Sequence, residues 1–322
     1  MKKMTRRLSI LLVALLALSS LAGSAFAEGN IYNIGIIQLI QHPALDAATQ
    51  GFQDALVEKL GEDAVTFDYQ NAQGDSSNCA TIVNGFVSAG VDLIMANATA
   101  ALQAAFNGTE TIPILGTSIT TYPAALEIEV NEDGSTGYNV SGTSDLAPLD
   151  GQAEVLNTLF PDAKTVGLLY CSAEANSKYQ IDVIEPILQG YGYETTRYTF
   201  SDSNDLASVV TKAASEIDVL YVPTDNTVAN NTEVVNNICL PAGIPVIAGE
   251  EGICAGCGVA TLSISYYDIG YATGLMAYEI LAEGTDVSAM PIQYAPQFVK
   301  EYNAEICEAL GITVPEDYQP IE

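Results

Sequence analysis

The sequence predicts an α/β protein made of two similar doubly wound parallel-sheet lobes. Three observations support this fold class. Short apolar runs alternate with amphipathic stretches along the chain, and the second half of the chain repeats the pattern of the first. The chain is also long enough, at roughly 295 residues after an N-terminal export segment, to fill two domains of ordinary size.

The predicted strands are short runs rich in Val, Ile and Leu. In chain order they are NIGIIQLI, AVTFDYQ, VDLIMA, IPILGT, TVGLLY, TTRYTF, IDVLYVP and IPVIAG. Between them lie stretches such as DAATQGFQDALVEKLG, SNCATIVNGFVSAG and NDLASVVTKAASEI, whose periodicity predicts helices of ten or more residues. Apolar strands that alternate with such helices favour parallel sheets covered by helices on both faces.

The internal repeat divides the chain into two lobes. QGDSSNCATIVNGFVSAGVDLIMANAT aligns with FSDSNDLASVVTKAASEIDVLYVPTD, and IPILGTS aligns with IPVIAGE, at offsets of 126 to 132 residues. The strand–helix rhythm ends after GVATLSISYYDIGYATGLMAYEILAEG, so the chain is expected to cross between lobes again there. We assign residues 28–161 and 263–285 to the first lobe, and residues 162–262 and 286–322 to the second, with the boundary near Pro161.

The N-terminal segment predicts export from the cytoplasm. Four cations precede an apolar run that ends at Ala25-Phe26-Ala27, which is the pattern of a secretory signal peptide over residues 1–27. No second apolar run is long enough to span a membrane, so we expect no transmembrane helix. No cysteine follows LAG, so we expect an extracytoplasmic protein without a lipid anchor.

The charge excludes two classes of partner. Without the four cations of the signal segment, six Lys and Arg oppose forty Asp and Glu, a net charge of about −34. Such a surface repels nucleic acid and anionic lipid. Because 48% of the residues are hydrophobic, the chain can still build a core despite this charge.

The six cysteines point to no metal or redox cofactor. Cys254 and Cys257 form a single C-x-x-C pair, and one pair cannot make a four-ligand zinc site. The one histidine, His42, is far away in sequence. We interpret the pair as either a structural disulfide or free thiols, and we expect no cofactor.

The loops that follow the predicted strands indicate a small zwitterionic ligand. They are rich in hydroxyls, amides and carboxylates, and Lys178 is the only cation among them. None has the glycine spacing that binds phosphate. A ligand carboxylate would therefore be held by hydroxyls and helix N-terminal N–H groups, and a ligand ammonium by acids of the second half. The candidates are Thr99, Thr117 and Ser118 for the carboxylate, and Asp225, Glu250 or Glu251 for the ammonium.

Several of these residues have a structural interpretation as well. Asp225 and Asn226 could cap the next helix, and His42, which precedes Pro43, could serve a turn. Tyr266 and the tyrosines that follow it are interpreted as packing. Catalysis is not expected, because there is one histidine and no G-x-S-x-G motif.

Six segments resemble the signature segments of one family. QHPALDAATQGF, YQNAQGD, SGTSDLAP, SAEANS, VPTDNTVA and AGEEG are similar, in the same order, to segments of the tryptophan/tyrosine-type ABC transporter substrate-binding proteins. The resemblance extends from Ile34 to Ile312. It implies a type I periplasmic-binding-protein fold with three crossovers between lobes, and a receptor that serves an ABC permease. Characterised relatives bind aromatic amino acids.

The resemblance also implies a division of roles between the lobes. By analogy with branched-chain amino-acid receptors of this fold, the first lobe would hold the carboxylate, and Asp225 or Glu250 of the second lobe would meet the amino group. Asp145, in SGTSDLAP, would lie at the strand end leading to the first hinge and reach the cleft. On this basis Asp225→Ala is predicted to abolish binding and leave the fold intact.

The sequence thus predicts a monomeric receptor for an aromatic or other apolar amino acid, which binds between the lobes by hinge closure and is not an enzyme. The alternatives are a receptor for an uncharged solute, such as a nucleoside or sugar, and a sensory binding protein for a membrane kinase. The predicted ligand-binding residues are Gln38, His42, Thr99, Thr117, Ser118, Asp145, Asn176, Thr224, Asp225, Asn226 and Glu250.

Overall fold

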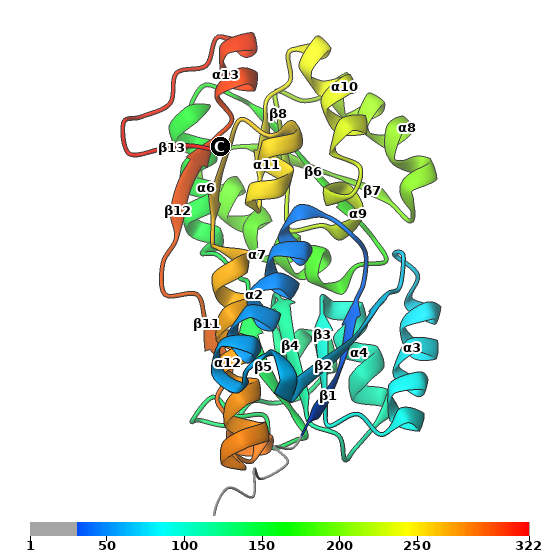
Figure 1. Ribbon diagram of the computed structural model, residues 1–322. Helices are drawn as coiled ribbons and strands as arrows, with labels where there is room; N and C mark the ends of the chain where they lie inside the picture. Colours follow the sequence, from blue (N-terminus) through cyan, green and yellow to red (C-terminus); the bar gives the residue numbers. More distant parts are fainter. Residues whose placement is uncertain (1–30, 322) are drawn as a thin grey trace, which may run out of the picture. The chain divides into compact units, whose positions relative to one another are not determined.

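The computed structural model describes residues 31–321 and contains two mainly parallel β-sheets, each flanked by helices (Figure 1). The predicted signal peptide lies outside the described residues. Within residues 31–321, no helix combines the length and apolar character needed to cross a bilayer.

The first lobe holds the sheet with strand order β11-β5-β4-β3-β1-β2. Its strands all run parallel, and its helices come from both the start and the end of the chain. Its elements are β1 (Tyr32–Gln38), α2 (Pro43–Leu60), η1 (Glu62–Ala64), β2 (Val65–Asn71), α3 (Ser76–Ala89), β3 (Leu93–Asn97), α4 (Thr99–Gly108), β4 (Ile114–Ile119), α5 (Tyr122–Leu126), β5 (Val140–Ser144), α12 (Tyr266–Glu283), η2 (Val287–Ala289) and β11 (Gln293–Tyr294).

The second lobe holds the sheet with strand order β13-β12-β10-β9-β8-β6-β7. The pairing of β10 with β12 is antiparallel, and the other strand pairs are parallel. Its elements are α6 (Leu149–Leu159), β6 (Thr165–Cys171), α7 (Ala175–Gly190), β7 (Glu194–Phe200), α8 (Ser203–Ala214), β8 (Val219–Val222), α9 (Asn226–Ala229), α10 (Thr232–Ala242), β9 (Val246–Ala248), α11 (Glu251–Cys257), β10 (Ala260–Ser263), β12 (Val299–Tyr302), α13 (Ala304–Leu310) and β13 (Gln319–Pro320).

The strand order confirms the repeat found in the sequence. The first five strands of one lobe are arranged 2-1-3-4-5, and β6 to β10 repeat this order as 7-6-8-9-10. Each of these five strands therefore has a counterpart in the other lobe, with β1 matching β6, β3 matching β8 and β4 matching β9. In both sheets the order reverses beside the first strand, which is the place where open parallel sheets bind ligands.

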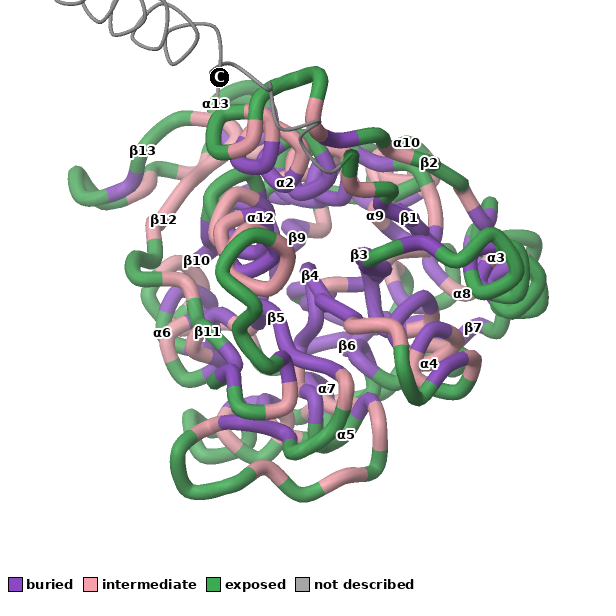
Figure 2. The backbone as a smooth tube through the Cα atoms, turned by 60° about the horizontal axis from the view of Figure 1, so that its bottom comes forward, coloured by how far each residue is buried: buried purple, intermediate pink, exposed green. Residues whose placement is uncertain are grey.

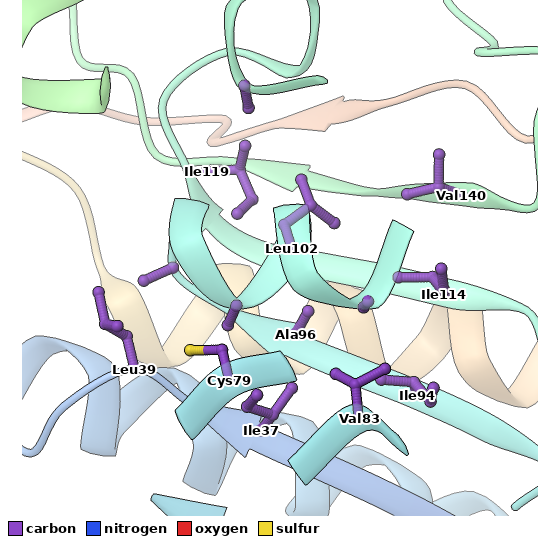
Figure 3. Close-up of a cluster of buried hydrophobic side chains, with 14 of the residues drawn as sticks. Ile37, Leu39, Cys79, Val83, Ile94, Ala96, Leu102, Ile114, Ile119 and Val140 are labelled. Atoms are coloured by element: carbon purple, nitrogen blue, oxygen red, sulfur yellow. The ribbon is translucent and has the colours of Figure 1, made fainter. Parts of the chain in front are cut away.

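Alternation of strands and helices produces a buried core in each lobe. In the first lobe, side chains of Ile37, Ile94 and Ile114 from three adjacent strands meet Val83 of α3 and Leu102 of α4 (Figure 3). Strands β4 and β5 are buried throughout, whereas most of α3 is exposed on its outer side (Figure 2). A strand buried on both faces often reads as a continuous apolar run, which is why β4 was recognisable in the sequence. Strand β5, with the sequence VSGTS, has no such run and was not among the predicted strands.

Helices α2 and α12 pack very closely on one face of the first sheet (Figure 1). A Cβ atom added at Gly270 would collide with the carbonyl oxygen of Ala48, and one at Gly51 would collide with that of Tyr267. Glycine at both positions lets the two backbones approach. This contact fixes the start of α12, and with it Tyr266, against the start of α2.

Two segments lie in a different lobe from the one expected. Helix α6 packs on α7 and β10, and the Gln152 side chain donates to the carbonyl oxygens of Gly249 and Leu262, so the chain enters the second lobe at about residue 148 rather than near Pro161. Strand β11 pairs with β5, so residues 286–294 belong to the first lobe. The chain crosses between lobes three times, at residues 145–148, 264–265 and 295–298. The boundary near Pro161 was placed from the internal repeat, which carries no information on the sheet that a helix covers.

All six cysteines are buried free thiols. Of the two interpretations for Cys254 and Cys257, the structure has the free thiols. Burial raises the pKa of both groups, so they remain protonated and act as small apolar side chains.

Candidate functional site

A small cavity lies where the carboxyl ends of the strands of the two lobes face each other. Polar side chains from both lobes line it, and Lys and Arg are absent from its lining. The lining residues are His42, Leu45, Ser118, Thr120, Asp145 and Tyr266 of the first lobe, and Asn176, Thr224, Asp225, Asn226, Ala229 and Glu250 of the second.

Asp145 is a buried carboxylate with one unpaired oxygen. It follows β5 directly, and its backbone N–H donates to the carbonyl oxygen of Ile119, which anchors it to the first sheet. The Tyr266 hydroxyl donates to Asp145 Oδ2 at 3.0 Å, whereas Oδ1 has no hydrogen-bond partner among the described residues. Burial raises the pKa of Asp145 to about 6. A free carboxylate oxygen in a cavity attracts a donor with positive charge.

Ser118 presents an unpaired hydroxyl to the same cavity. The register of β4 against β5 shifts between Gly116 and Ile119, and Ser118 lies at this irregularity with φ of 57°. Its Oγ atom is buried and has no partner among residues 31–321. Ala98, at the end of the neighbouring strand β3, also has a positive φ, of 84°. Such conformations cost about 1–3 kcal/mol for residues other than glycine and cluster at binding sites.

His42 reaches across the cavity to the second lobe. It precedes α2, is 7% exposed, and its Nε2 lies 3.2 Å from Asn226 Oδ1. The other ring nitrogen, Nδ1, has no partner among the described side chains or backbone groups. Burial lowers the pKa of His42, although the hydrogen bond to Asn226 and the charges of Glu174 and Asp46 oppose the shift.

The two second-lobe acids that line the cavity are helix caps. Asp225 accepts from the backbone N–H groups of Val228, at 2.9 Å, and Cys171, at 2.7 Å, one on each oxygen. Glu250 accepts from the N–H groups of Gly252 and Ile253 at the start of α11. Burial raises the pKa of both carboxyls, that of Glu250 to about 7. Their oxygens are already engaged by the backbone.

Further second-lobe polar groups hold one another in place. Asn176 donates to the Thr224 carbonyl oxygen at 3.0 Å and to Glu174, and Gln180 donates to Thr224 Oγ1. Gln180 Nε2 also lies 3.2 Å from Thr120 Oγ1, so it forms a second hydrogen bond between the lobes. The loops of the second lobe thus form a connected network whose outer members contact the first lobe.

Three predicted binding residues do not line the cavity. Gln38 binds Asp46, the Ile40 carbonyl oxygen and Thr49 within the first lobe. Thr117 Oγ1 accepts from Thr143, and Thr99 is buried at the start of α4. Gln38 and Thr117 lie in strands, which turn alternate residues to opposite faces, and the sequence does not reveal which face lies toward the cleft. Thr99 is instead the first residue of α4 and one of its buried residues.

Four lining residues were not predicted. Leu45, Thr120, Ala229 and Tyr266 come from helix starts and a strand end next to predicted residues. Tyr266 had been interpreted as packing. Residue spacing could have indicated two of these residues. Leu45 lies three residues after His42, and Ala229 lies three residues after Asn226, so each is on the same helix face as a predicted contact.

Two lobes with parallel sheets, three crossovers and an interlobe cavity define a type I solute-binding protein. Residues 33–319 match the family model described as "ABC transporter substrate binding protein". The chain belongs to this family, whose members are binding proteins and not enzymes.

Particular relatives agree with this assignment. The chain is 36% identical, over 97% of its length and 94% of the relative, to a tyrosine-binding protein of Clostridioides difficile strain R20291. A Streptococcus pneumonia protein solved in complex with L-Trp has a TM-score of 0.86 at 32% identity, covering 91% of this chain and 100% of that one. The ligand-free, open structure of a Clostridium difficile substrate-binding protein with adhesive properties has a TM-score of 0.69 at 38% identity, covering 91% and 99%.

Proposed function

We propose that the protein is the extracytoplasmic receptor of an ABC importer and that it captures an aromatic amino acid in the interlobe cavity. The observation that carries the proposal is a pair of unpaired polar atoms. Asp145 Oδ1 and Ser118 Oγ are both buried, both belong to cavity-lining residues, and neither has a hydrogen-bond partner among the described residues. Buried polar atoms are almost always paired, so these two await a ligand.

The acid indicates an ammonium group. A buried carboxylate is stabilised by a positive partner, and the cavity lining has no Lys or Arg to provide one. Asp225 and Glu250, which were expected to meet the amino group, have their oxygens engaged by backbone N–H groups. We therefore assign the ammonium to Asp145, with the Tyr266 hydroxyl holding the carboxylate in position.

The neighbouring hydroxyl suits the ligand carboxylate. Ser118 lies at the end of β4, which pairs directly with β5, the strand that ends beside Asp145. The two ends of an α-amino acid are separated by one carbon atom, so adjacent strand ends match that spacing. Ser118 can donate its O–H to the carboxylate without any arginine, in agreement with the shortage of cations in the loops.

Closure of the lobes is supported by two kinds of observation. His42 to Asn226 and Gln180 to Thr120 are hydrogen bonds that exist only when the lobes are together. The fold also resembles the L-Trp complex more than the open, ligand-free relative, with TM-scores of 0.86 and 0.69, although the open relative is the more identical. We infer that the described conformation is the closed one, and that ligand binding stabilises it.

The aromatic side chain is supported by the relatives and by the lining. One relative is named for tyrosine and another was solved with L-Trp. Leu45 and Ala229 add apolar surface to the cavity. An uncharged solute such as a nucleoside or sugar remains the competing ligand, but it would leave the Asp145 carboxylate without a positive partner.

Thermal-shift screening of the mature protein against the twenty amino acids, nucleosides and common sugars tests the proposal. We expect the largest rise in melting temperature with tyrosine, tryptophan or phenylalanine, because a ligand that binds only the folded state stabilises it by mass action. If only a nucleoside or a sugar raises the melting temperature, the amino-acid assignment is wrong.

A further inference from the structure

We propose that His42 Nδ1 accepts a hydrogen bond from a donor on the ligand's aromatic ring. The cavity would then select a ring that carries O–H or N–H, as in tyrosine and tryptophan, over the plain ring of phenylalanine. This inference rests on the proposed function and specifies the ligand class of the same site.

Hydrogen bonds determine which nitrogen of His42 carries the proton. Glu174 accepts from Asn226 through both its backbone N–H, at 3.0 Å, and its side-chain Nδ2, at 2.7 Å. It also accepts from the N–H and hydroxyl of Thr227, each at 2.8 Å. The amide of Asn226 cannot be reversed, because its oxygen would then face this carboxylate. Asn226 Oδ1 therefore faces His42, so Nε2 is the donor, and a neutral ring carries its lone pair on Nδ1.

The lone pair is buried and belongs to a residue that lines the cavity. His42 is more than nine-tenths buried, lines the cavity, and has no partner for Nδ1 among residues 31–321. Burial keeps the ring neutral by lowering its pKa, which preserves the acceptor. A buried acceptor without a donor is destabilising. The ligand is the remaining source of a donor.

Strand order shows which part of the ligand reaches His42. His42 follows β1 and Asp145 follows β5, and β3 and β4 lie between these two strands. Neighbouring strands are about 4.8 Å apart, so the strand axes are separated by about 14 Å. An ammonium at Asp145 and a carboxylate at Ser118 place both charged groups at the β5 and β4 end. Only the side chain of the amino acid can extend toward β1.

The surroundings of His42 suit a ring edge. Leu45 is one turn after His42 on α2, and Ala229 is one turn after Asn226 at the end of α9, so both apolar residues lie at this end of the cavity. Apolar side chains beside a single unpaired acceptor match an aromatic ring with one polar substituent.

The test is calorimetric binding of L-tyrosine, L-tryptophan and L-phenylalanine to the mature protein and to three variants. His42→Gln can keep the donor to Asn226 through Nε2 but has no acceptor at the position of Nδ1. His42→Asn keeps an oxygen near that position but loses the bond to Asn226. Asp145→Asn tests the ammonium contact, which all three ligands share.

In the wild type, we expect tyrosine or tryptophan to bind at least about tenfold more tightly than phenylalanine, since phenylalanine leaves the acceptor unpaired. In His42→Gln this preference should disappear, because tyrosine and tryptophan lose the hydrogen bond and phenylalanine no longer leaves an acceptor unpaired. His42→Asn should retain part of the preference. Asp145→Asn should lower the affinity for all three ligands by the same factor.

Three results would overturn the inference. The first is equal affinity of the wild type for the three ligands. The second is that His42→Gln lowers the affinity for all three ligands equally, which would assign His42 to lobe closure or to the ligand's charged ends. The third is binding of none of the three to the wild type, which would refute the proposed function and this inference with it. The first two results would not contradict the proposed function.

Acidification provides a second readout. Protonation of Nδ1 removes the acceptor, so the ratio of tyrosine to phenylalanine affinity should fall at low pH. Other groups near His42 also titrate or carry charge, namely Asp46 on α2, Glu174 before α7, Asp225 before α9, and Asp145 and Glu250 across the cavity. Their effects on the ammonium and carboxylate are common to both ligands and cancel in the ratio. A ratio that stays constant or rises on acidification would contradict the assignment.

Discussion

The two lobes contribute opposite kinds of polar group to the cavity. The first lobe provides His42 Nδ1, Ser118 Oγ and Asp145 Oδ1, none of which has a partner among the described residues. In the second lobe, each carboxylate oxygen of Asp225 and Glu250 already accepts a hydrogen bond from a backbone N–H group. The lobes share a fold and a strand order, so this difference comes from their loops and not from their architecture.

This difference between the lobes indicates that a buried acid in a binding cavity need not contact the ligand. An acid that caps a helix positions the loop around it, and its charge is already compensated by N–H groups. An acid with an unpaired oxygen has bonding capacity left for a guest. We therefore propose that the first lobe carries the ligand contacts and that the second lobe covers them.

The largest expected effect comes from Asp145→Asn. The amide cannot pair with an ammonium, so amino-acid affinity should fall at least about a hundredfold, the scale seen when one partner of a buried charge pair is removed. The unliganded variant should melt at the same temperature as the wild type or higher, because a desolvated carboxylate has been removed. Calorimetry and thermal unfolding measure the two quantities.

Asp268→Asn is the matched control for that variant, since Asp268 is exposed on the first turn of α12. It should change neither affinity nor melting temperature. If Asp145→Asn bound its amino acid as well as this control does, the assignment of the ammonium to the first lobe would be wrong.

A smaller effect, on stability, is expected for Asp225→Ala. The substitution removes a helix cap and leaves the buried Cys171 N–H unpaired, which together cost roughly 2–4 kcal/mol in the free energy of unfolding. Urea denaturation measures this loss. Asp75→Ala, which removes the exposed cap of α3, should cost only about 1 kcal/mol. The sequence-based prediction was the reverse, a lost ligand and an intact fold, and that outcome would restore Asp225 as a contact.

The smallest effect concerns pH. Burial raises the folded-state pKa values of Asp145 to about 6 and of Glu250 to about 7, above their ordinary values. At these two positions the folded protein binds protons more tightly than the unfolded chain, so their contribution to the stability of the unliganded protein should be lost as pH rises from about 4 to about 7. Stabilisation by an amino acid should follow the opposite trend, because its ammonium pairs with ionised Asp145. Melting curves at about pH 5 and pH 8, with and without the amino acid, would show these two trends. A larger ligand-induced rise in melting temperature at pH 5 than at pH 8 would contradict the prediction.

Much of the fold could be predicted from local patterns. Runs such as VDLIMA and IDVLYVP became β3 and β8, and their shared spacing to the preceding helix correctly indicated two related lobes. Asp75, which directly precedes α3, caps this helix by accepting from the Ser77 N–H. The lobe boundary was misplaced, because α6 has the amphipathic pattern of any surface helix and its partner sheet is set by contacts distant in sequence.

The candidate site was predicted only in part. Of the eleven predicted residues, Gln38, Thr99 and Thr117 do not line the cavity. Gln38 and Thr117 lie in strands, where a one-residue change of position turns a side chain to the other face. Tyr266 was missed, since its only polar contact in the site, to Asp145, joins residues 121 positions apart.

The sequence by itself determined the alternation of strands and helices, the duplication of the lobe, and the concentration of hydroxyl, amide and carboxyl groups at the strand ends. Only the tertiary structure decided which of those groups remain free to bind. Hydrogen-bond saturation depends on partners brought together by folding, as Glu174 meets Asn226 across 52 residues and Cys171 meets Asp225 across 54. A buried carboxylate can therefore be a helix cap in one lobe, whereas a carboxylate in the other lobe keeps an unpaired oxygen.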